Sequence, residues 1–179
     1  MSCIKTYTGI MFDPLNPKPE EIKILDIAHS LSMLCRANGH FYSFYSVGQH
    51  CINCAREAAA RGYSLRVQLA CLLHDASEAY LSDVTRPVKK ELPRYLEIET
   101  PLQETIWGVF LGAPLTAEEN TQVFAVDDAM LWHEFVALMD TELYPNGPQL
   151  LSQPEFAFTG FADTCDTFLQ LFEALKKKQ

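Results

Sequence analysis

The pair His74-Asp75 is the part of this chain whose residue types are best suited to chemistry. It follows an apolar run, Leu69 to Leu73, of the kind that forms a buried helix. Burying an unpaired carboxylate costs roughly several kcal/mol. A divalent cation removes that cost, because imidazole and carboxylate are both ligands for such ions. The pair therefore predicts part of a metal site.

Two more residues can address the same point. Glu78 follows His74 by four positions and Asp75 by three, so one continuous helix would place all three side chains on one face. His50 lies near the start of the preceding expected helix. A cluster of acidic and imidazole groups around one ion is the interpretation that these spacings favour.

Asp127 and Asp128 interrupt the apolar run VFAVDDAMLW inside another expected helix. Two acidic residues in such a stretch need a partner, and a metal would provide one. Neighbours on a helix lie about 100° apart, so only one of the two can face the ion.

Composition limits the class of protein. The chain has 179 residues, 48% of them hydrophobic and 21% charged, which fits one globular domain over 1–179. A net charge of −9 argues against a nucleic-acid polymer as partner. The beginning MSCIKTYTG lacks a secretory pattern and no apolar stretch reaches the roughly 18 residues of a membrane span, so we expect a cytoplasmic protein without membrane contact.

Cys51 and Cys54 form a CxxC motif, which can indicate zinc binding or redox chemistry. No second CxxC accompanies it, and both cysteines lie among apolar residues of an expected helix. We therefore expect these two, like most of the six cysteines, to be free buried thiols.

Helical periodicity is common and strand signals are scarce, so the expected fold class is all-α, a bundle of about five to six main helices. Asn38-Gly39 and Gly112 are expected helix ends, and Ser46, Ser64 and the pair Thr116/Glu119 are expected N-terminal caps. The expected elements are an irregular leader 1–20, helices over about 20–37, 47–61, 65–79, 96–111, 117–143 and 161–177, and loops at 82–93 and 144–155, with the last helix filling the C-terminal part 161–179.

Four segments in order resemble the HD-domain metal-dependent phosphohydrolases. They are DIAHSLSMLCRANGH, FYSVGQH, HDASEAYLSDVTRPVK and VDDAMLWHE. The likeness covers about residues 7–140 and is greatest to the YfbR-like 5′-nucleotidase branch, while the leader YTGIMFDPLNP resembles related uncharacterised bacterial and phage HD proteins.

The resemblance implies that His50, His74, Asp75 and Asp127 hold one divalent ion, with Mn, Co, Zn, Fe and Ni all suited to mixed nitrogen and oxygen ligands. It selects Asp127 over Asp128, because the family's ligand lies seven residues before the position of Glu134 here. Dinuclear members of the resembled superfamily, including oxygenases, have further histidines between these two ligand positions. No histidine occurs between Asp75 and Asp127 here, so the resemblance favours a single metal and hydrolysis over oxygen chemistry.

The same resemblance implies roles around the ion. Glu78 matches the general acid/base and Asp83 a second carboxylate that assists the leaving group or binds ribose. Arg36 matches the arginine that contacts phosphate, and Lys89 and Arg86 would add positive charge.

Several residues carry two interpretations. His40 either reaches the phosphate or caps backbone carbonyls at a helix end. The aromatic residues Tyr42, Phe44 and Tyr45 either stack on a nucleobase or close the core. We expect His29 and His133 to be structural.

The expected function is removal of phosphate from a (deoxy)ribonucleoside 5′-monophosphate by a water that the metal activates. A nucleoside triphosphate triphosphohydrolase is one alternative, and a non-catalytic nucleotide- or metal-sensing module is another. The expected partner is a small nucleotide, and the resemblance also implies a homodimer.

Overall fold

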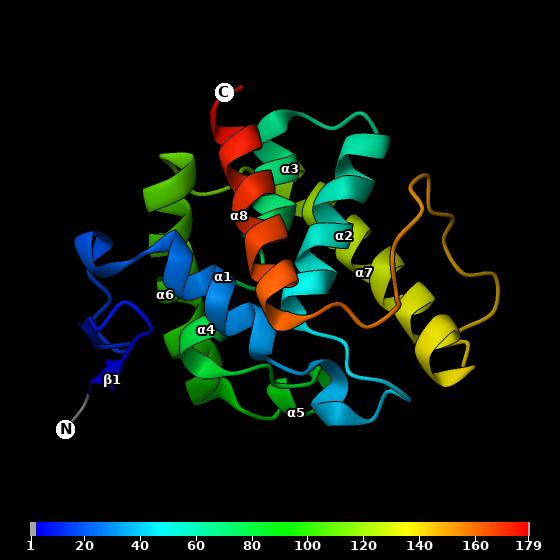
Figure 1. The fold of residues 1–179 in the computed structure, drawn as a ribbon, viewed down its shortest axis with the longest axis horizontal. Coiled ribbons are helices and arrows are strands. Elements are labelled where there is room, and N and C mark those ends of the chain that lie inside the picture. Colours follow the sequence, from blue (N-terminus) through cyan, green and yellow to red (C-terminus); the bar gives the residue numbers. More distant parts are fainter. Residues whose placement is uncertain (1–2, 179) are drawn as a thin grey trace.

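Helices form nearly all of the regular structure in the computed structural model, which describes residues 3–178 (Figure 1). Six of them have nine residues or more: α1 (Ile24–Met33), α2 (Val47–Ala60), α3 (Leu65–Leu73), α6 (Pro93–Leu111), α7 (Ala117–Met139) and α8 (Phe161–Lys176). The short helices α4 (Glu78–Leu81) and α5 (Arg86–Lys89) lie between α3 and α6. The all-α fold class is confirmed.

Side-chain caps begin three of these helices where the sequence predicts them. The Ser46 side chain accepts a hydrogen bond from the backbone of Gln49 and starts α2. Ser64 does the same for α3. Thr116 and Glu119 form a reciprocal capping box at the start of α7. Each cap satisfies an N–H group that the first helical turn would otherwise leave without a partner.

Helix α2 is central, because it packs against α1, α3, α7 and α8 (Figure 1). The main core cluster fills the space among α1, α2, α3, α6 and α8. Its fully buried side chains include Ile27, Leu31, Leu69, Leu72, Leu73, Leu102, Ile106 and Phe168. Each such side chain stabilises the fold by about 1.5–3 kcal/mol.

A second cluster packs α2 and α3 against α7. Its members are mostly small or slender: Cys54, Ala58, Val67, Ala70, Cys71, Val123, Val126 and Met130. Small side chains let helices approach closely, so this cluster brings together the three segments that carry the predicted metal ligands.

The first helix is shorter than the predicted 20–37. After Met33 the chain becomes extended at Leu34 and pairs with the segment before α2, through Arg36 N to Tyr45 O and Val47 N to Leu34 O. Two 3-10 turns, η1 (Pro19–Glu21) and η2 (Arg36–Gly39), occupy the ends of the predicted range. Long-range backbone pairing, which local periodicity does not reveal, ends this helix.

The predicted helix over 65–79 is also interrupted. Helix α3 ends at Leu73, and His74–Ser77 form tight turns before α4 begins at Glu78. Gln103 of α6 satisfies the backbone freed by this break, because its side chain accepts from Ser77 N at 3.0 Å and donates to Leu73 O at 2.8 Å. The break turns His74 and Asp75 out of regular helix.

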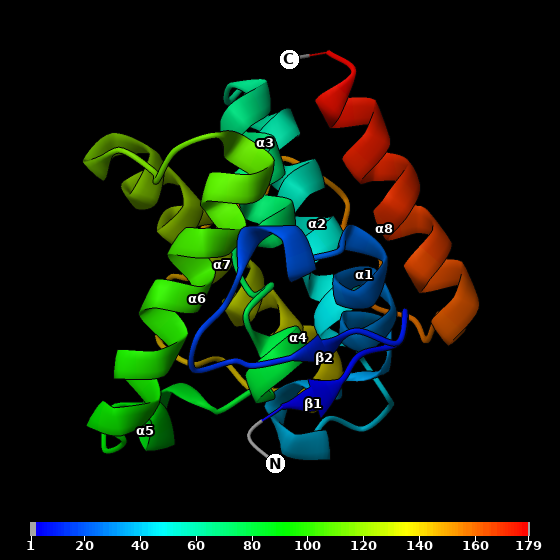
Figure 2. The ribbon, with the colours of Figure 1, turned by 90° about the vertical axis from the view of Figure 1, so that its left-hand side faces the viewer.

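Two segments predicted as irregular contain regular structure. The leader holds an antiparallel hairpin of β1 (Ile4–Lys5) and β2 (Met11–Phe12), which lies in front of α1 and α4 in Figure 2. The predicted loop 82–93 contains α5. Among the described residues, no helix combines the length and the apolar character that crossing a bilayer requires.

Candidate metal centre

The four predicted ligands converge, although they come from three separate segments. His50 lies in the first turns of α2, His74 and Asp75 in the turns after α3, and Asp127 in the middle of α7. The two Nε2 atoms of His50 and His74 are 3.1 Å apart. His50 Nε2 is 3.2 Å from Asp127 Oδ1 and 3.7 Å from Asp75 Oδ2, and His74 Nε2 is 3.6 and 3.4 Å from the same two oxygens.

The other ring nitrogen of each histidine faces an acceptor. His50 Nδ1 lies 2.6 Å from Glu134 Oε1, and His74 Nδ1 lies 2.7 Å from the carbonyl oxygen of Cys71. A carboxylate and a carbonyl can only accept, so both Nδ1 atoms carry the hydrogen. Both Nε2 lone pairs are therefore left for the shared centre, the arrangement that orients histidine ligands in metal sites.

The spacing of these atoms fits one cation. Nitrogen and oxygen ligands about 2.1 Å from a single ion lie about 3.0–3.5 Å from one another. The five distances above, 3.1 to 3.7 Å, are close to that range. Two imidazole lone pairs and two carboxylate oxygens that meet without a positive charge would repel, so the chemistry of the donor set also fits a metal.

The local electrostatic field favours positive charge at this point. Burial alone would raise the pKa of Asp127, but the adjacent imidazole groups of His50 and His74 outweigh burial and hold that pKa well below its ordinary value. Burial lowers the pKa of His74, but the Asp75 carboxylate raises it by more, so the pKa of His74 lies well above its ordinary value. A local field that favours positive charge on imidazole also favours a cation at the same place.

Asp127 and Asp128 divide as the sequence predicts for neighbours on a helix. Asp127 turns Oδ1 to the histidines. Asp128 instead accepts from Arg86 Nη1 at 2.9 Å and from the Tyr144 hydroxyl at 3.0 Å. The structure thus brings Asp127, and not Asp128, to the cluster.

A cavity of about 560 Å³ opens beside the cluster. Its charged lining comprises Arg36, Asp75, Glu78, Asp83, Arg86, Lys89 and Asp127. Its apolar lining includes Phe41, Val84, Pro87, Leu131, Phe135 and Leu143. The volume is typical of a small-molecule site, and the lining separates into a charged end and an apolar wall.

Glu78 and Asp83 are the acidic groups of the cavity outside the four predicted ligands. Burial, together with the carboxylates of Asp75 and Asp83, holds the pKa of Glu78 well above its ordinary value. Burial also raises the pKa of Asp83. Glu78 Oε2 is buried and has no hydrogen-bond partner, while Lys89 Nζ lies 3.6 Å from its Oε1. Burial in this position favours the protonated form of the Glu78 carboxyl group.

Arg36 and Glu134 connect the ligands behind the cavity. Arg36 donates from Nε to Glu134 Oε2 at 3.1 Å and from Nη1 to Asp75 Oδ2 at 3.4 Å. Glu134 is fully buried and also bonds to His50. Arg36 therefore contacts two of the predicted ligands, Asp75 directly and His50 through Glu134, in addition to lining the cavity.

The role of Glu134 was missed at the level of sequence. Glu134 lies seven residues after Asp127, two helical turns on the same face, inside an apolar stretch of α7. That spacing was a usable signal for a carboxylate directed at the same site.

His40 and the three aromatic residues considered for base stacking, Tyr42, Phe44 and Tyr45, do not line this cavity. His40 is exposed and outside the cavity lining. Tyr42 is 74% exposed, Phe44 packs against Phe158 and Phe161, and Tyr45 is buried. The aromatic pair that lines the cavity is Phe41 and Phe135, edge to face at 5.5 Å.

Cys51 and Cys54 are free and buried, as predicted. Burial raises the pKa of the Cys51 thiol to about 11 and that of Cys54 well above its ordinary value. Cys54 Sγ lies within 4.8 Å of the ligand atoms of both histidines, but it is 3.5 Å from His50 Nε2 and 3.9 Å from His50 Nδ1. Near-equal distances place the sulfur against the ring face, off the lone pair of Nε2.

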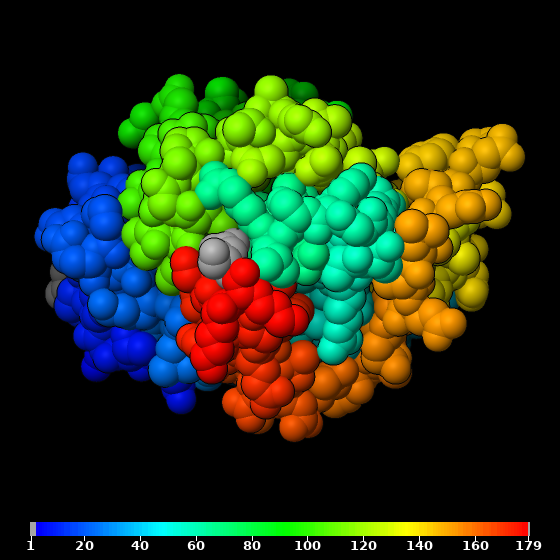
Figure 3. All heavy atoms as spheres, turned by 90° about the horizontal axis from the view of Figure 1, so that it is seen from above, coloured from blue at the N-terminus to red at the C-terminus, as the bar shows by residue number. Residues whose placement is uncertain are grey.

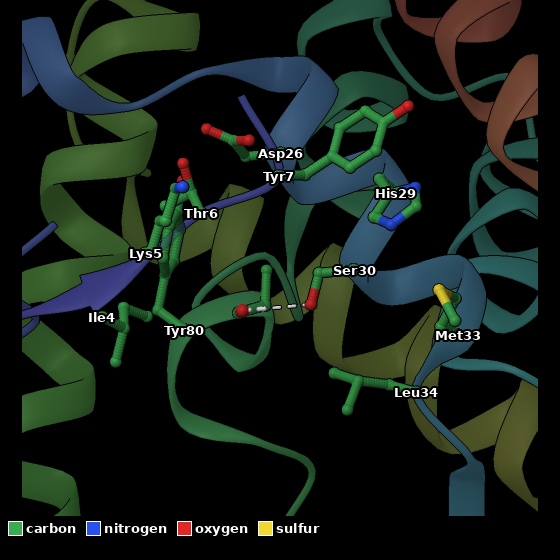
Figure 4. A pocket seen from close by; sticks show the side chains of 11 residues that line it. Ile4, Lys5, Thr6, Tyr7, Asp26, His29, Ser30, Met33, Leu34 and Tyr80 are labelled. Atoms are coloured by element: carbon green, nitrogen blue, oxygen red, sulfur yellow. Dashed lines mark hydrogen bonds between the residues drawn. The ribbon is translucent and has the colours of Figure 1, made fainter. Parts of the chain in front are cut away.

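A second cavity, of about 360 Å³, lies between the N-terminal hairpin, α1 and α4 (Figure 4). Its polar groups mostly bond within the protein: Ser30 donates to Ala79 O, and buried Asp26 accepts twice from Thr8. Tyr7 stacks on His29 at 3.7 Å, which gives that histidine a packing role. Within residues 3–178, converging acceptors of the kind found at the first cavity do not occur here.

The chain is 39% identical to the uncharacterized protein YfdR of Escherichia coli over 158 residues, which cover 80% of this chain and 84% of that protein. The chain belongs to the YfdR family. It is also 38% identical to the uncharacterized protein RCAP_rcc00048 of Rhodobacter capsulatus over 130 residues, 69% of this chain and 66% of that protein. No family model matches the chain. Both relatives are named as uncharacterized proteins, so their names assign no activity to this chain.

Proposed function

We propose that this chain is a metal-dependent phosphohydrolase of nucleotides, most simply one that removes the 5′-phosphate of (deoxy)ribonucleoside monophosphates. The observation that supports it best is the set of four acceptor atoms from His50, His74, Asp75 and Asp127, spaced for one ion. The resemblance of the surrounding segments to HD-domain phosphohydrolases supports the same proposal.

The donor set suits one divalent ion with mixed nitrogen and oxygen ligands, such as Mn²⁺, Co²⁺, Zn²⁺, Fe²⁺ or Ni²⁺. An ion bound there supplies a water of lowered pKa and polarises a phosphoryl oxygen.

The charged end of the cavity suits a phosphate. Arg36 and Lys89 both line it and place positive charge beside the ligand cluster. Guanidinium and ammonium groups neutralise phosphate oxygens through short charge-assisted hydrogen bonds. Its bond to Glu134 orients the Arg36 guanidinium, which lines the cavity.

The acidic groups of the cavity suit proton transfer. Glu78 lines the cavity with a buried carboxyl oxygen that has no partner in the protein. It can take a proton from the attacking water or pass one to a reacting oxygen. Asp83, in the same lining, can protonate the leaving ribose oxygen or bind a ribose hydroxyl.

The apolar wall suits the nucleoside. Phe41 and Phe135 present aromatic surface, and Leu131 and Leu143 extend it. A nucleobase buries apolar and aromatic area against such a surface while the phosphate occupies the charged end.

The proposal is tested by measuring product release from ribo- and deoxyribonucleoside mono- and triphosphates. Purified protein is stripped of metal and reloaded with each divalent ion. Orthophosphate from monophosphates, dependent on metal, supports the proposal. Release of intact triphosphate would instead identify a triphosphohydrolase, and nucleotide binding without any product would identify a sensing module.

Two variants control this assay. Asp127→Asn removes a predicted ligand while it keeps the size of the side chain. Asp166→Asn makes the same change at an exposed position on α8. Turnover that is lost in the first variant and kept in the second assigns the activity to this centre rather than to a contaminating phosphatase.

A further inference from the structure

Arg86 binds both acidic residues of the Asp127-Asp128 pair. Its Nη2 donates to Asp127 Oδ2 at 2.6 Å, and its Nη1 donates to Asp128 Oδ1 at 2.9 Å. The guanidinium also lies over the ring of Phe124, 5.7 Å from its centroid. The fork of an arginine is one of the few side chains that can span two separate carboxylates with short bonds.

These contacts give the two oxygens of Asp127 different partners. Oδ1 lies 3.2 Å from His50 Nε2 and 3.6 Å from His74 Nε2. Oδ2 is taken by Arg86. A carboxylate whose second oxygen is held in a charge-assisted bond is directed to bind an ion through one oxygen.

The anchoring of Arg86 extends to the segment that follows α7. Asp128 uses its other oxygen to accept from the Tyr144 hydroxyl at 3.0 Å, and the backbone oxygen of Tyr144 accepts from Trp132 Nε1 at 3.0 Å. Leu143, next to Tyr144, lines the cavity. The guanidinium is thus fixed from the side of α7 and from the cavity rim.

We infer that Arg86 is a positioning residue for the candidate metal centre. Arg86 holds Asp127 so that this aspartate binds the ion through Oδ1 alone. The inference rests on the proposed function, because it requires that the centre binds a divalent ion. It adds a second role to the expectation that Arg86 supplies positive charge near the phosphate.

The consequence of this role is an open coordination sphere. Four protein atoms, one from each ligand, leave positions for water and for a phosphoryl oxygen. An aspartate free to bind through both oxygens would occupy one of those positions. Partners that orient a ligand in this way commonly change metal affinity or activity by about 10–100-fold when they are removed.

The test measures Co²⁺ binding by direct titration and by visible absorption, in the full-length protein and without nucleotide. Arg86→Met keeps an apolar stem over Phe124 and removes the fork. Arg86→Lys keeps the charge but can serve only one carboxylate well. Arg94→Met is the matched control, because Arg94 is exposed and pairs only with Glu97 in the same helix.

For Arg86→Met we expect Co²⁺ affinity lower by about 10–100-fold and weaker visible absorption, the sign of a higher coordination number. Arg86→Lys should show a smaller change in both, and Arg94→Met none. The same affinity and spectrum in Arg86→Met and Arg94→Met would overturn the inference, even if Arg86→Met had a lower Tm. Absence of Co²⁺ binding by the unchanged protein would instead reject the metal centre itself, and the inference with it.

Discussion

A fully buried carboxylate lies at each end of α2, Glu57 at the C-terminal end and Glu134 at the N-terminal end. The two differ in the further contacts that their hydrogen-bond partners make. At the C-terminal end, Glu57 accepts from Arg61, which follows the last residue of α2, from the backbone N–H groups of Leu151 and Ser152, and from the Ser152 hydroxyl. At the N-terminal end, the partners of Glu134 are His50 and Arg36.

The network of Glu57 is closed. The carboxylate oxygens of Glu57 accept hydrogen bonds that attach the segment between α7 and α8 to α2. Figure 3 shows that segment, in orange, along the side of α2 and its neighbours. Hydrogen bonds from Ser152 and Arg61 outweigh burial and lower the pKa of Glu57. Glu57 and its partners Arg61, Leu151 and Ser152 do not line the cavity beside the predicted ligands.

The network of Glu134 is open. Each of its partners has a further polar atom at the cavity or at the ligand cluster: His50 presents Nε2, and Arg36 presents Nη1 to Asp75. A buried charge is therefore a weak sign of function by itself. The onward contacts of the partners separate the two carboxylates, because only the partners of Glu134 reach the candidate metal centre.

The largest expected effect comes from the ligands themselves. His74→Ala should lower metal affinity by more than about 100-fold, since a ligand contributes more than the partners that orient it. Loss of stability should follow, because half-buried Asp75 is left with fewer polar partners. Metal content by elemental analysis checks this, and full stoichiometry in the variant would contradict the site as described.

Glu78→Gln should separate chemistry from binding. We expect turnover to fall about 10²–10⁴-fold, the usual contribution of a general acid/base, while bound metal stays unchanged. Glu99→Gln is a suitable control, since Glu99 also bonds to Lys89 but does not line the cavity. Unchanged turnover in the Glu78 variant would remove Glu78 from the mechanism.

Glu134→Gln tests the open network. A glutamine keeps the shape but loses the charge that fixes His50 and Arg36, so metal affinity should fall by about 10–100-fold. Titration with Co²⁺ or Mn²⁺ measures it. An affinity equal to that of the unchanged protein would place Glu134 in the same structural class as Glu57.

Glu57→Gln tests the closed network and should give the opposite profile. We expect the free energy of unfolding to fall by about 1–3 kcal/mol, with metal affinity unchanged. Denaturant unfolding and the same Co²⁺ titration measure the two quantities. A loss of metal affinity here would show that the two ends of α2 are coupled.

The smallest expected effect is a pH dependence of the Glu57 contribution. The folded-state pKa of Glu57 is lowered, so its stabilisation is complete above the unfolded-state pKa of about 4.3. It is lost as pH falls through the folded-state pKa. The difference in unfolding free energy between the unchanged protein and Glu57→Gln should therefore shrink in acid, and a constant difference would contradict this assignment.

Local signals in the sequence predicted local structure well. The caps at Ser46, Ser64 and Thr116 depend on side chains that bond within three residues, and all three form. The all-α class follows from periodicity of the same short range.

Two helix boundaries were predicted wrongly from the sequence, because long-range contacts determine them. The end of α1 depends on pairing with residues 45–47, and the break after α3 on Gln103, whose bonds span 26 and 30 residues. The same limit applies to the candidate site. The meeting of His50, His74, Asp75 and Asp127 was expected through resemblance. The seven-residue spacing from Asp127 indicates only the helix face of Glu134, and its contacts, like those of Arg86, depend on tertiary packing that residue types do not specify.

The break at His74 also has a consequence for the stability of the folded chain. His50 and His74 are 24 residues apart in sequence, and Asp127 comes from a third helix. A cation bound to all of them would close two loops at once and act as a cross-link among α2, α3 and α7. At a free concentration 100 times its Kd, such a ligand adds about 2.7 kcal/mol to the stability of a folded chain. Resistance to proteolysis would then report metal occupancy in a cell extract before any substrate is known.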